Sequence, residues 1–280
     1  MRALFLIPGD ATEQLQATAA VAAVADQLSM EVHIACAPAL APCWSLVPAV
    51  KKVIPFDFGS ATLADWANLL GSVREPDFQL CINLATGRQV DLMLSMSHIP
   101  TRIARGGFSA TETVPAPAGG WPNQTLETYL KPLGVSLDAV LFRPTLPKAA
   151  LDQASSLLPA GDGPLLLLAP QGGAADWPAE RWLGLPAQIA AKLPTLRCLQ
   201  RSPATASEVR QRAALVARAD VVLASDPITV ELALLLGVPL VALGRSPETL
   251  PQRQGVIGLG EVAHLADLLP SQVLSALGFG

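Results

Sequence analysis

The stretch ADVVLASDPITVELALLLGVPLVALG, residues 219–244, decides the fold class. It contains an apolar run ending at Ser225, an Asp-Pro pair, an apolar segment of helical length, a Gly-Val-Pro break and a second apolar run. A buried strand, a helix that begins at Pro227 and a second buried strand give this pattern. Two buried strands joined by a helix predict a parallel sheet.

The same alternation extends along both halves of the chain. We predict strands over residues 2–8, 31–37, 53–58, 78–84, 164–170 and 196–200, and helices over 11–28, 61–70, 90–96, 178–193 and 207–218. Residues 109–123 are rich in Pro, Gly and Ala and predict a long loop. The sequence therefore predicts an α/β protein with two doubly wound Rossmann-like domains, residues 1–145 and 146–280, and a ligand cleft between them. We also predict a last helix near residues 266–277, which is free to pack back across the boundary between the two domains.

Composition excludes several classes of protein. Of 280 residues, 51% are hydrophobic and 15% are charged, which excludes a disordered chain. The 19 basic and 23 acidic residues give a net charge of −4, so the chain has no basic field for nucleic acid.

The mean hydropathy of +0.40 is high enough for a membrane protein, so the length of the apolar runs decides whether one could span a bilayer. The longest apolar stretch, Leu232 to Gly244, contains Gly237 and Pro239 and is too short to span a bilayer. The N-terminal apolar run stops at Pro8, short of a signal-peptide core. We expect a cytoplasmic protein without a transmembrane segment, with room for peripheral contact at the inner face of the membrane.

The residues that many catalytic chemistries need are missing. The four cysteines are widely spaced and three lie in apolar runs, which favours buried free thiols over disulfides or metal ligands. The three histidines have no carboxylate or cysteine at metal-ligand spacing. There is no G-x-S-x-G elbow and no D-x-D pair. We therefore predict no metal site and no cofactor.

Candidate functional residues follow the strands, because ligands bind at the carboxyl ends of parallel strands. Asp10, after the first strand, is a candidate base, and the alternative is a helix N-cap, since Glu13 stands at capping-box spacing. The loop QGGAADWP, residues 171–178, offers backbone amides to an anion, and the alternative is a plain strand-to-helix turn. Asp226 and Arg245 follow the next two strands; their alternatives are an N-cap and an exposed loop arginine.

Taken in order, these segments resemble the heptosyltransferase-like glycosyltransferases of family 9 over nearly the whole chain. The first-half matches are LFLIPGDATEQLQATAAVAAVADQL and LVPAVKKVIPFDF, the latter at residues 46–58. The second-half matches are GGAADWPAERWLGL and LVARADVVLASDPITVELALLLGVPLVALGRSP. The resemblance implies a GT-B fold and metal-independent, inverting transfer of a heptose-like sugar. The donor would be a nucleotide sugar, such as an ADP-linked one, and the acceptor a cell-envelope glycan of lipopolysaccharide type.

The resemblance also implies roles for single residues. Asp10 would be the catalytic base, with Gly9 and Thr12 beside it on the acceptor side. The donor side would comprise Gln171, Gly172, Gly173, Arg181, Asp226, Thr229, Glu231 and Arg245.

Three positions depart from the family pattern. Asp176 replaces a lysine before Trp-Pro, Pro227-Ile228 replaces Ser/Thr-Gly, and Glu231 replaces a histidine. All three changes remove donors or charge that a diphosphate needs. Either Arg181, Arg201 or Arg245 substitutes for them, or the chain is a catalytically silent relative that binds a protein or glycan partner. A Rossmann-type dehydrogenase is disfavoured, because no glycine fingerprint follows Leu6. For a transferase we expect Asp10→Ala to abolish turnover and to leave stability unchanged or raised.

Overall fold

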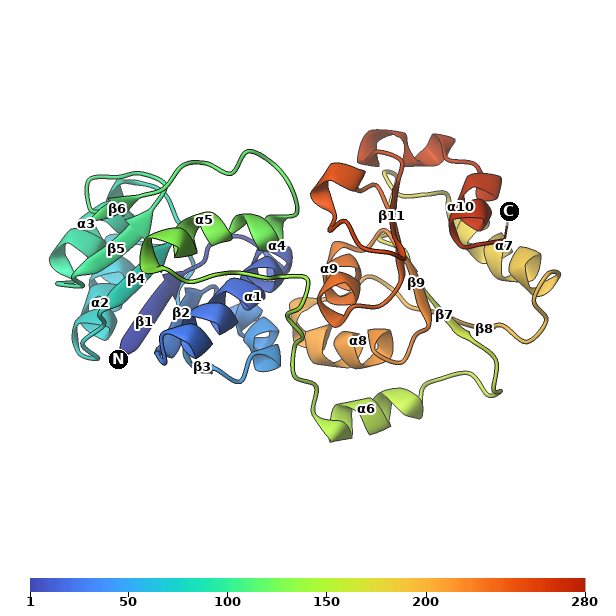
Figure 1. Ribbon diagram of the computed structural model, residues 1–280, viewed down its shortest axis with the longest axis horizontal. Helices are drawn as coiled ribbons and strands as arrows, with labels where there is room; N and C mark the ends of the chain where they lie inside the picture. The colour runs from blue at the N-terminus through green and yellow to red at the C-terminus, as the bar shows by residue number, and fades with distance from the viewer. Residues whose placement is uncertain (280) are drawn as a thin grey trace. The chain divides into compact units, whose positions relative to one another are not determined.

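A computed structural model describes residues 1–279 of the chain, which form two compact units. Unit 1 contains residues 1–118 and 122–142, and unit 2 contains residues 119–121 and the chain from Arg143 onward. The structure thus changes unit after Phe142, whereas the sequence pattern places the boundary after residue 145. Each unit has a parallel sheet covered by helices on both faces (Figure 1).

The sheet of unit 1 has six parallel strands in the order β3-β2-β1-β4-β5-β6. The strands are β1 (Arg2–Leu6), β2 (Glu31–Cys36), β3 (Val50–Pro55), β4 (Leu80–Asn83), β5 (Thr101–Ala104) and β6 (Glu112–Thr113). The central register places Leu4 of β1 beside His33 of β2 and Cys81 of β4. Strand order reverses between β1 and β4, and such a switch point opens a crevice at the strands' carboxyl ends.

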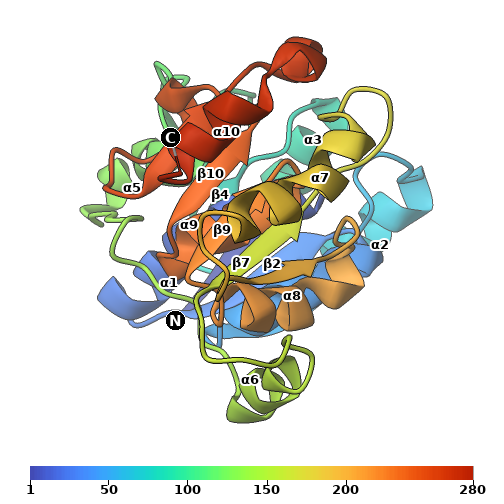
Figure 2. The ribbon, with the colours of Figure 1, turned by 90° about the vertical axis from the view of Figure 1, so that its right-hand side faces the viewer.

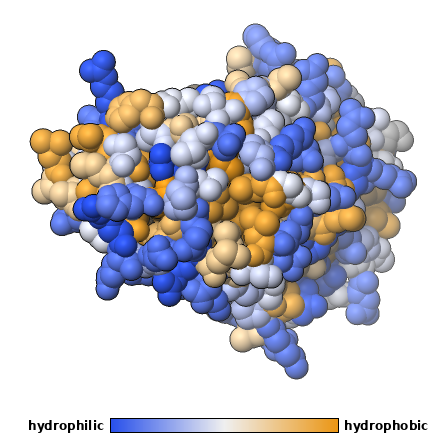
Figure 3. Space-filling model, turned by 60° about the vertical axis from the view of Figure 1, so that its left-hand side comes forward, coloured by the Kyte–Doolittle hydropathy of each residue, from blue (hydrophilic) through white to orange (hydrophobic). Residues whose placement is uncertain are grey.

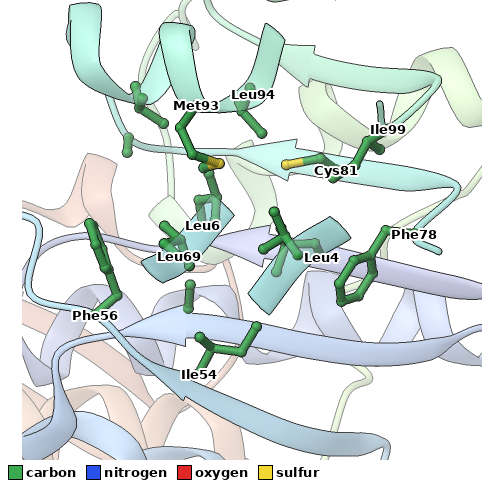
Figure 4. Packing of buried hydrophobic residues seen from close by; sticks show 14 residues of the cluster. Leu4, Leu6, Ile54, Phe56, Leu69, Phe78, Cys81, Met93, Leu94 and Ile99 are labelled. Carbon is green, nitrogen blue, oxygen red and sulfur yellow. The ribbon is translucent and has the colours of Figure 1, made fainter. Parts of the chain in front are cut away.

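Helices of unit 1 bury their apolar faces on this sheet. They are α1 (Ala11–Gln27), η1 (Pro38–Leu46), α2 (Leu63–Arg74), α3 (Arg88–Met96), α4 (Pro122–Thr125), α5 (Glu127–Leu130) and η2 (Lys131–Leu133). In Figure 4, Leu6 of β1 and Cys81 of β4 meet Leu69 of α2 and Met93 of α3 in one core. The helix α1 contacts η1, α4 and α5. Burial of these side chains, at roughly 25 cal/mol per Å² of apolar surface, is the main stabilising contribution to the unit.

The sheet of unit 2 has five parallel strands in the order β11-β10-β9-β7-β8, so its switch point lies between β7 and β9. Its elements are α6 (Lys148–Ser155), β7 (Leu165–Ala169), α7 (Ala179–Ala190), β8 (Arg197–Gln200), η3 (Ala206–Glu208), α8 (Val209–Val216), β9 (Val221–Ala224), α9 (Pro227–Leu236), β10 (Leu240–Leu243), η4 (Pro247–Thr249), β11 (Val256–Leu259), η5 (Val262–Asp267) and α10 (Pro270–Ala276).

The helices α7 and α10 of unit 2 lie side by side (Figure 2). Trp177, just before α7, and Trp182, within α7, belong to the core of this unit. Trp177 and Trp182 meet edge to face with their ring centroids 5.4 Å apart. The indole N–H of Trp177 donates to the carbonyl oxygen of Leu268 at 2.8 Å, so this buried donor is satisfied. The helices α8 and α9 pack against each other, and α9 contacts β9 and β10.

The predicted fold class is confirmed, and the differences lie in short or edge elements. The strand β3 covers Val50–Pro55 rather than 53–58, and the predicted loop 109–123 contains β6. The sequence analysis missed β5, β11, α6 and the 3-10 helix η1. The last helix, Pro270–Ala276, packs on α7 of its own unit. Among residues 1–279, no helix is both long and apolar enough to cross a membrane.

All four cysteines are free, as the sequence predicts: Cys36, Cys43 and Cys81 are buried, and Cys198 is half-buried. Burial raises the pKa of Cys36 to about 11 and that of Cys43 to about 12, and it raises the pKa of the other two thiols as well. The thiolate is therefore scarce at neutral pH at every position.

We predict that a thiol reagent at neutral pH finds no fast-reacting cysteine in the native protein. Cys198 reacts slowly, because its side chain is partly accessible, and all four thiols titrate after unfolding in guanidinium. An absorbance assay with an aromatic disulfide checks this. Rapid modification of any native thiol would contradict the prediction.

Candidate functional site

The turn from β1 into α1 holds Asp10 in a fixed position. Gly9 has φ +94°, and a Cβ there would lie 2.9 Å from Cδ of Glu13, so both the backbone conformation and the close approach require glycine. Asp10 is the N-cap of α1: its Oδ1 accepts from the backbone N–H of Thr12 at 2.6 Å. The Asp10 N–H donates to Oε2 of Glu13 at 2.9 Å, which completes a capping box. The capping alternative for Asp10 is therefore confirmed.

A buried glutamine ties this turn to the rest of unit 1. The Nε2 of Gln14 donates to the carbonyl oxygens of Ile7 and Pro8 at 3.1 and 3.2 Å. Its Oε1 accepts from the indole N–H of Trp44 at 3.1 Å. Because Gln14 is fully buried, these contacts fix the turn that carries Asp10.

The two carboxyl groups of the capping box have pKa values shifted in opposite directions. A side-chain hydrogen bond between Asp10 and Glu13 lowers the pKa of Asp10 and raises that of Glu13. When the pair holds one proton, that proton resides on Glu13, and Asp10 is a carboxylate. Asp10 is also exposed to solvent, so the capping role leaves it accessible to a substrate hydroxyl.

Unit 1 has two hollows that share Leu84, Arg105 and Tyr129, and one of them is lined by residues of this turn. One, of about 410 Å³, is lined by residues 83–87 after β4 and by Asp91 and Arg105. The other, of about 240 Å³, is lined by Pro8 and Glu13 together with Arg105 and Tyr129. The sequence analysis missed Arg105 and Tyr129. The available signal for Arg105 was its position directly after a strand, but that strand, β5, was not predicted.

At the switch point of unit 2 lies a pocket of about 180 Å³ that joins three strand ends. Gln171, Gly172 and Asp176 come from the loop after β7, Ser225 and Pro227 from the loop after β9, and Gly244 and Arg245 from the end of β10. The backbone N–H of Gln171 donates to Oγ of Ser225 at 2.8 Å, which links two of these loops. Gln171, Gly172 and Arg245 therefore lie together, as the sequence predicts.

The carboxylate of Asp176 accepts hydrogen bonds from backbone N–H groups that this loop could otherwise donate to a bound anion. Its Oδ2 accepts from the N–H of Gly172 and its Oδ1 from the N–H of Trp177, both at 2.7 Å. The residue is only 6% exposed, although it lines the pocket. Short bonds from backbone N–H to a carboxylate are strong, so the loop already holds an anion of its own.

Asp226 and Thr229 lie at the start of α9 and do not line the pocket. The carboxylate of Asp226 accepts from the N–H of Thr229 at 3.0 Å and from its hydroxyl, and it lies 3.5 Å from Nη1 of Arg212. The side chain of Asp226 is 2% exposed and Thr229 is fully buried. The N-cap alternative for Asp226 is confirmed, and both residues position the loop after β9.

Arg245 is the cation that lines the pocket, and a buried carboxylate is paired with it. Its Nη2 lies 3.0 Å from Oε1 of Glu231, whose side chain is fully buried. The Arg245 side chain is 21% exposed. The alternative of an exposed loop arginine is therefore wrong, and Glu231 acts on the pocket through its ion pair with Arg245.

Other sequence candidates lie elsewhere in unit 2. Nη1 of Arg181 donates to the carbonyl oxygens of Ala266 and Leu268 at 2.8 and 2.7 Å, and Arg181 does not line the pocket. Neither Gly173, with φ +84°, nor Arg201 lines the pocket. Within residues 1–279, no three His, Cys, Asp or Glu side chains are grouped as a metal site requires.

Comparisons with solved structures identify the fold. Over 99% of this chain, it is similar to the ADP-heptose lps heptosyltransferase II of E. coli, at 18% identity and a TM-score of 0.75, covering 98% of that chain. A glycosyl transferase family 9 protein from Veillonella parvula gives 15% identity, a TM-score of 0.76 and coverage of 99% and 96%. The E. coli heptosyltransferase WaaC, solved with ADP, gives 16% identity, a TM-score of 0.71 and 99% coverage of both chains. The chain therefore has the GT-B fold of the heptosyltransferases. The sequence matches no family model and no curated protein.

The capping box predicts how substitutions at Asp10 change stability. Asp10→Ala removes the cap of α1 and lowers the free energy of unfolding of unit 1 by about 1 kcal/mol, whereas Asp10→Asn keeps it close to wild type. This replaces the sequence-based expectation of unchanged or raised stability. Urea unfolding followed by circular dichroism checks it, and an Asp10→Ala protein as stable as wild type would contradict the capping role.

Proposed function

We propose that the protein is an inverting glycosyltransferase. It moves a heptose-like sugar from a nucleotide-sugar donor, ADP-linked by analogy, to a hydroxyl of a cell-envelope glycan, without a metal ion. The observation that carries this proposal is the exposed, ionised Asp10 at the switch point of unit 1, in a chain that shares the heptosyltransferase fold over 99% of its length.

In the proposed reaction Asp10 is the general base. Its carboxylate accepts the proton of the acceptor hydroxyl while the acceptor oxygen attacks the anomeric carbon of the sugar. The bond from that carbon to the donor phosphate oxygen breaks, and the nucleoside diphosphate leaves with the electron pair. A base held by Thr12 and Glu13 keeps its orientation through the reaction.

The proposed acceptor side belongs to unit 1 and the proposed donor side to unit 2. Gly9 and Thr12 shape the turn that presents Asp10, and Arg105 and Tyr129 line the adjacent hollows where polar groups of an acceptor would bind. The donor side comprises Gln171, Gly172, Ser225 and Arg245. Asp226, Thr229 and Glu231 are positioning residues there, since all three are buried.

A second candidate function is binding without transfer, and the contacts of Asp176 favour it. This carboxylate occupies the amides of Gly172 and Trp177, and Glu231 is paired with Arg245. A leaving diphosphate needs donors and positive charge that are free to meet it. A silent glycosyltransferase-like protein that binds a glycan or protein partner would tolerate this loss.

We predict that the full chain binds one of ADP, UDP or GDP in the micromolar range by calorimetry with a chelator present. Asp10→Asn leaves this affinity unchanged and reduces sugar transfer by about 10²- to 10⁴-fold, the range for a positioned base. Loss of nucleotide binding in Asp10→Asn would show that Asp10 is not simply the base. Failure of all three nucleotides would overturn the nucleotide-sugar proposal and leave the binding function.

Removing the charge of Asp176 distinguishes the two candidate functions, sugar transfer and binding without transfer. Asp176→Asn increases diphosphate affinity by about tenfold, because one negative charge leaves the pocket. Asp152→Asn, at an exposed position of α6, is the matched control and has no effect. If only Asp176→Asn binds nucleotide, the wild-type protein has the silent function. Unchanged affinity in Asp176→Asn would show that its carboxylate does not oppose the ligand.

A further inference from the structure

Unit 2 contains a buried arginine to which no sequence pattern points. Hydrophilic side chains are spread over the face of the molecule that Figure 3 brings forward, as is usual for charged groups. Arg212 of α8 is an exception, because it is 4% exposed, and it does not line the pocket. A guanidinium is costly to remove from water unless its N–H groups are satisfied. The contacts of Arg212 therefore indicate its role.

Arg212 joins the loop after β8 to the start of α9. Its Nη1 donates to Oγ1 of Thr229 at 2.7 Å and lies 3.5 Å from Oδ2 of Asp226. Its Nη2 donates to the carbonyl oxygen of Ser202, which follows β8. The two ends of one guanidinium thus hold two strand-end loops together. A lysine ammonium is a compact point charge and does not reproduce this planar fork.

The hydrogen bonds between these side chains run in one direction. The Thr229 hydroxyl accepts from Arg212, so its own proton goes to the carboxylate of Asp226. The same Oδ2 of Asp226 accepts from the backbone N–H of Thr229 at 3.0 Å and from that of Ala204 at 3.4 Å. A buried network whose members satisfy one another is rigid. Arg212 therefore fixes the position of Asp226 and of the backbone beside it.

The loop after β9 connects this network to the pocket. Ser225 precedes Asp226, and the backbone N–H groups of both residues donate to the carbonyl oxygen of Ala169, at the end of β7, at 3.1 Å. The Oγ of Ser225 accepts from the N–H of Gln171 at 2.8 Å. Ser225 and Gln171 line the pocket, whereas Arg212 does not. Contacts that start at Arg212 therefore reach two residues of the pocket wall.

We propose that Arg212 is a positioning residue for the nucleotide pocket of unit 2. It holds the loops after β7, β8 and β9 in the arrangement that a nucleoside diphosphate meets, and it does not contact the ligand itself. This role needs the shape of the guanidinium, because two nitrogens of one planar group meet three oxygen atoms. Since the proposed function assigns nucleotide binding to this pocket, the role of Arg212 rests on that function.

A contribution to stability alone is the competing account of Arg212. Burial lowers the pKa of Arg212, and the same loss of hydration offsets the attraction between its guanidinium and Asp226. Replacing a buried ion pair by uncharged side chains of similar size is often neutral for stability. A double substitution that removes both charges therefore distinguishes the two accounts. It restores the stability that a single substitution loses, and it does not restore the arrangement of the loops.

Three variants of the full chain test this role. Arg212→Met leaves the carboxylate of Asp226 buried without its cation and lowers the melting temperature. Arg212→Met combined with Asp226→Asn removes both charges, keeps an N-cap for α9 and restores the melting temperature. Arg212→Lys keeps the charge and loses the fork. Arg210→Met, at an exposed position two residues earlier on α8, is the matched control.

Hydrogen exchange, followed by mass spectrometry of peptides, measures the order of the loops without any ligand. We expect peptides that contain Gln171 and Ser225 to exchange at least about tenfold faster in the double variant and in Arg212→Lys, and at the wild-type rate in Arg210→Met. Calorimetry with ADP, UDP and GDP measures the pocket. Both variants bind the nucleotide that wild type prefers about tenfold more weakly, because binding must then order the loops.

Two results would overturn the positioning role. One is wild-type exchange of both loops in a double variant whose melting temperature is restored, and the other is unchanged nucleotide affinity in Arg212→Lys. If the double variant remains unstable, Arg212→Lys decides by the same two measurements. If the wild-type protein binds none of the three nucleotides, the proposed function fails, and the exchange rates still decide whether Arg212 orders the loops.

Discussion

The arrangement of both units depends on one constraint, which is that the free backbone N–H groups of loops after parallel strands need acceptors. This chain supplies its own carboxylates to three such loops. Asp10 caps α1, Asp226 caps α9, and Asp176 accepts from Gly172 and Trp177. These are the places where a helix start would otherwise receive a phosphate or carboxylate ligand. Local stability and anion binding therefore compete for the same donors.

Burial decides which of the three carboxylates is left for chemistry. Asp226 is 2% exposed and is engaged by Thr229 and Arg212, so it stabilises the loop and meets no ligand. Asp10 is exposed and ionised, and its capping bond to Thr12 leaves the carboxylate accessible. Asp176 lies between these cases, since it lines a pocket while it is 6% exposed. Asp176 alone thus determines whether this loop of unit 2 has backbone N–H groups free to bind an anion.

Sequence patterns predicted the buried strands and the strand-end loops, because these depend on local periodicity. β9, α9 and β10 follow directly from residues 219–244, and strand convergence brought Gln171 and Arg245 together. The strand β6 has two residues at the edge of the sheet and β5 has four residues next to it, so pairing rather than sequence pattern defines both strands. The ion pairs that determine the charge of the pocket in unit 2 were not predictable from sequence. Tertiary packing brings together Arg245 and Glu231, which are 14 positions apart, and it places Arg181 against the carbonyl oxygen of Ala266.

The Glu231–Arg245 pair would determine how the proposed donor site of unit 2 binds a diphosphate. Glu231 is fully buried, and removing the partner of a buried charge is strongly destabilising, by roughly 3–5 kcal/mol, so Arg245 stays beside it. A guanidinium has five N–H donors, and Nη2 carries the contact to Glu231, which leaves other donors for a ligand in the pocket. In the proposed donor site, the cation would then be an arginine whose charge is largely balanced by Glu231 before any ligand arrives. A nucleotide at that site would be held by geometry more than by net charge, and its affinity, rather than the fold, would distinguish the two proposed functions.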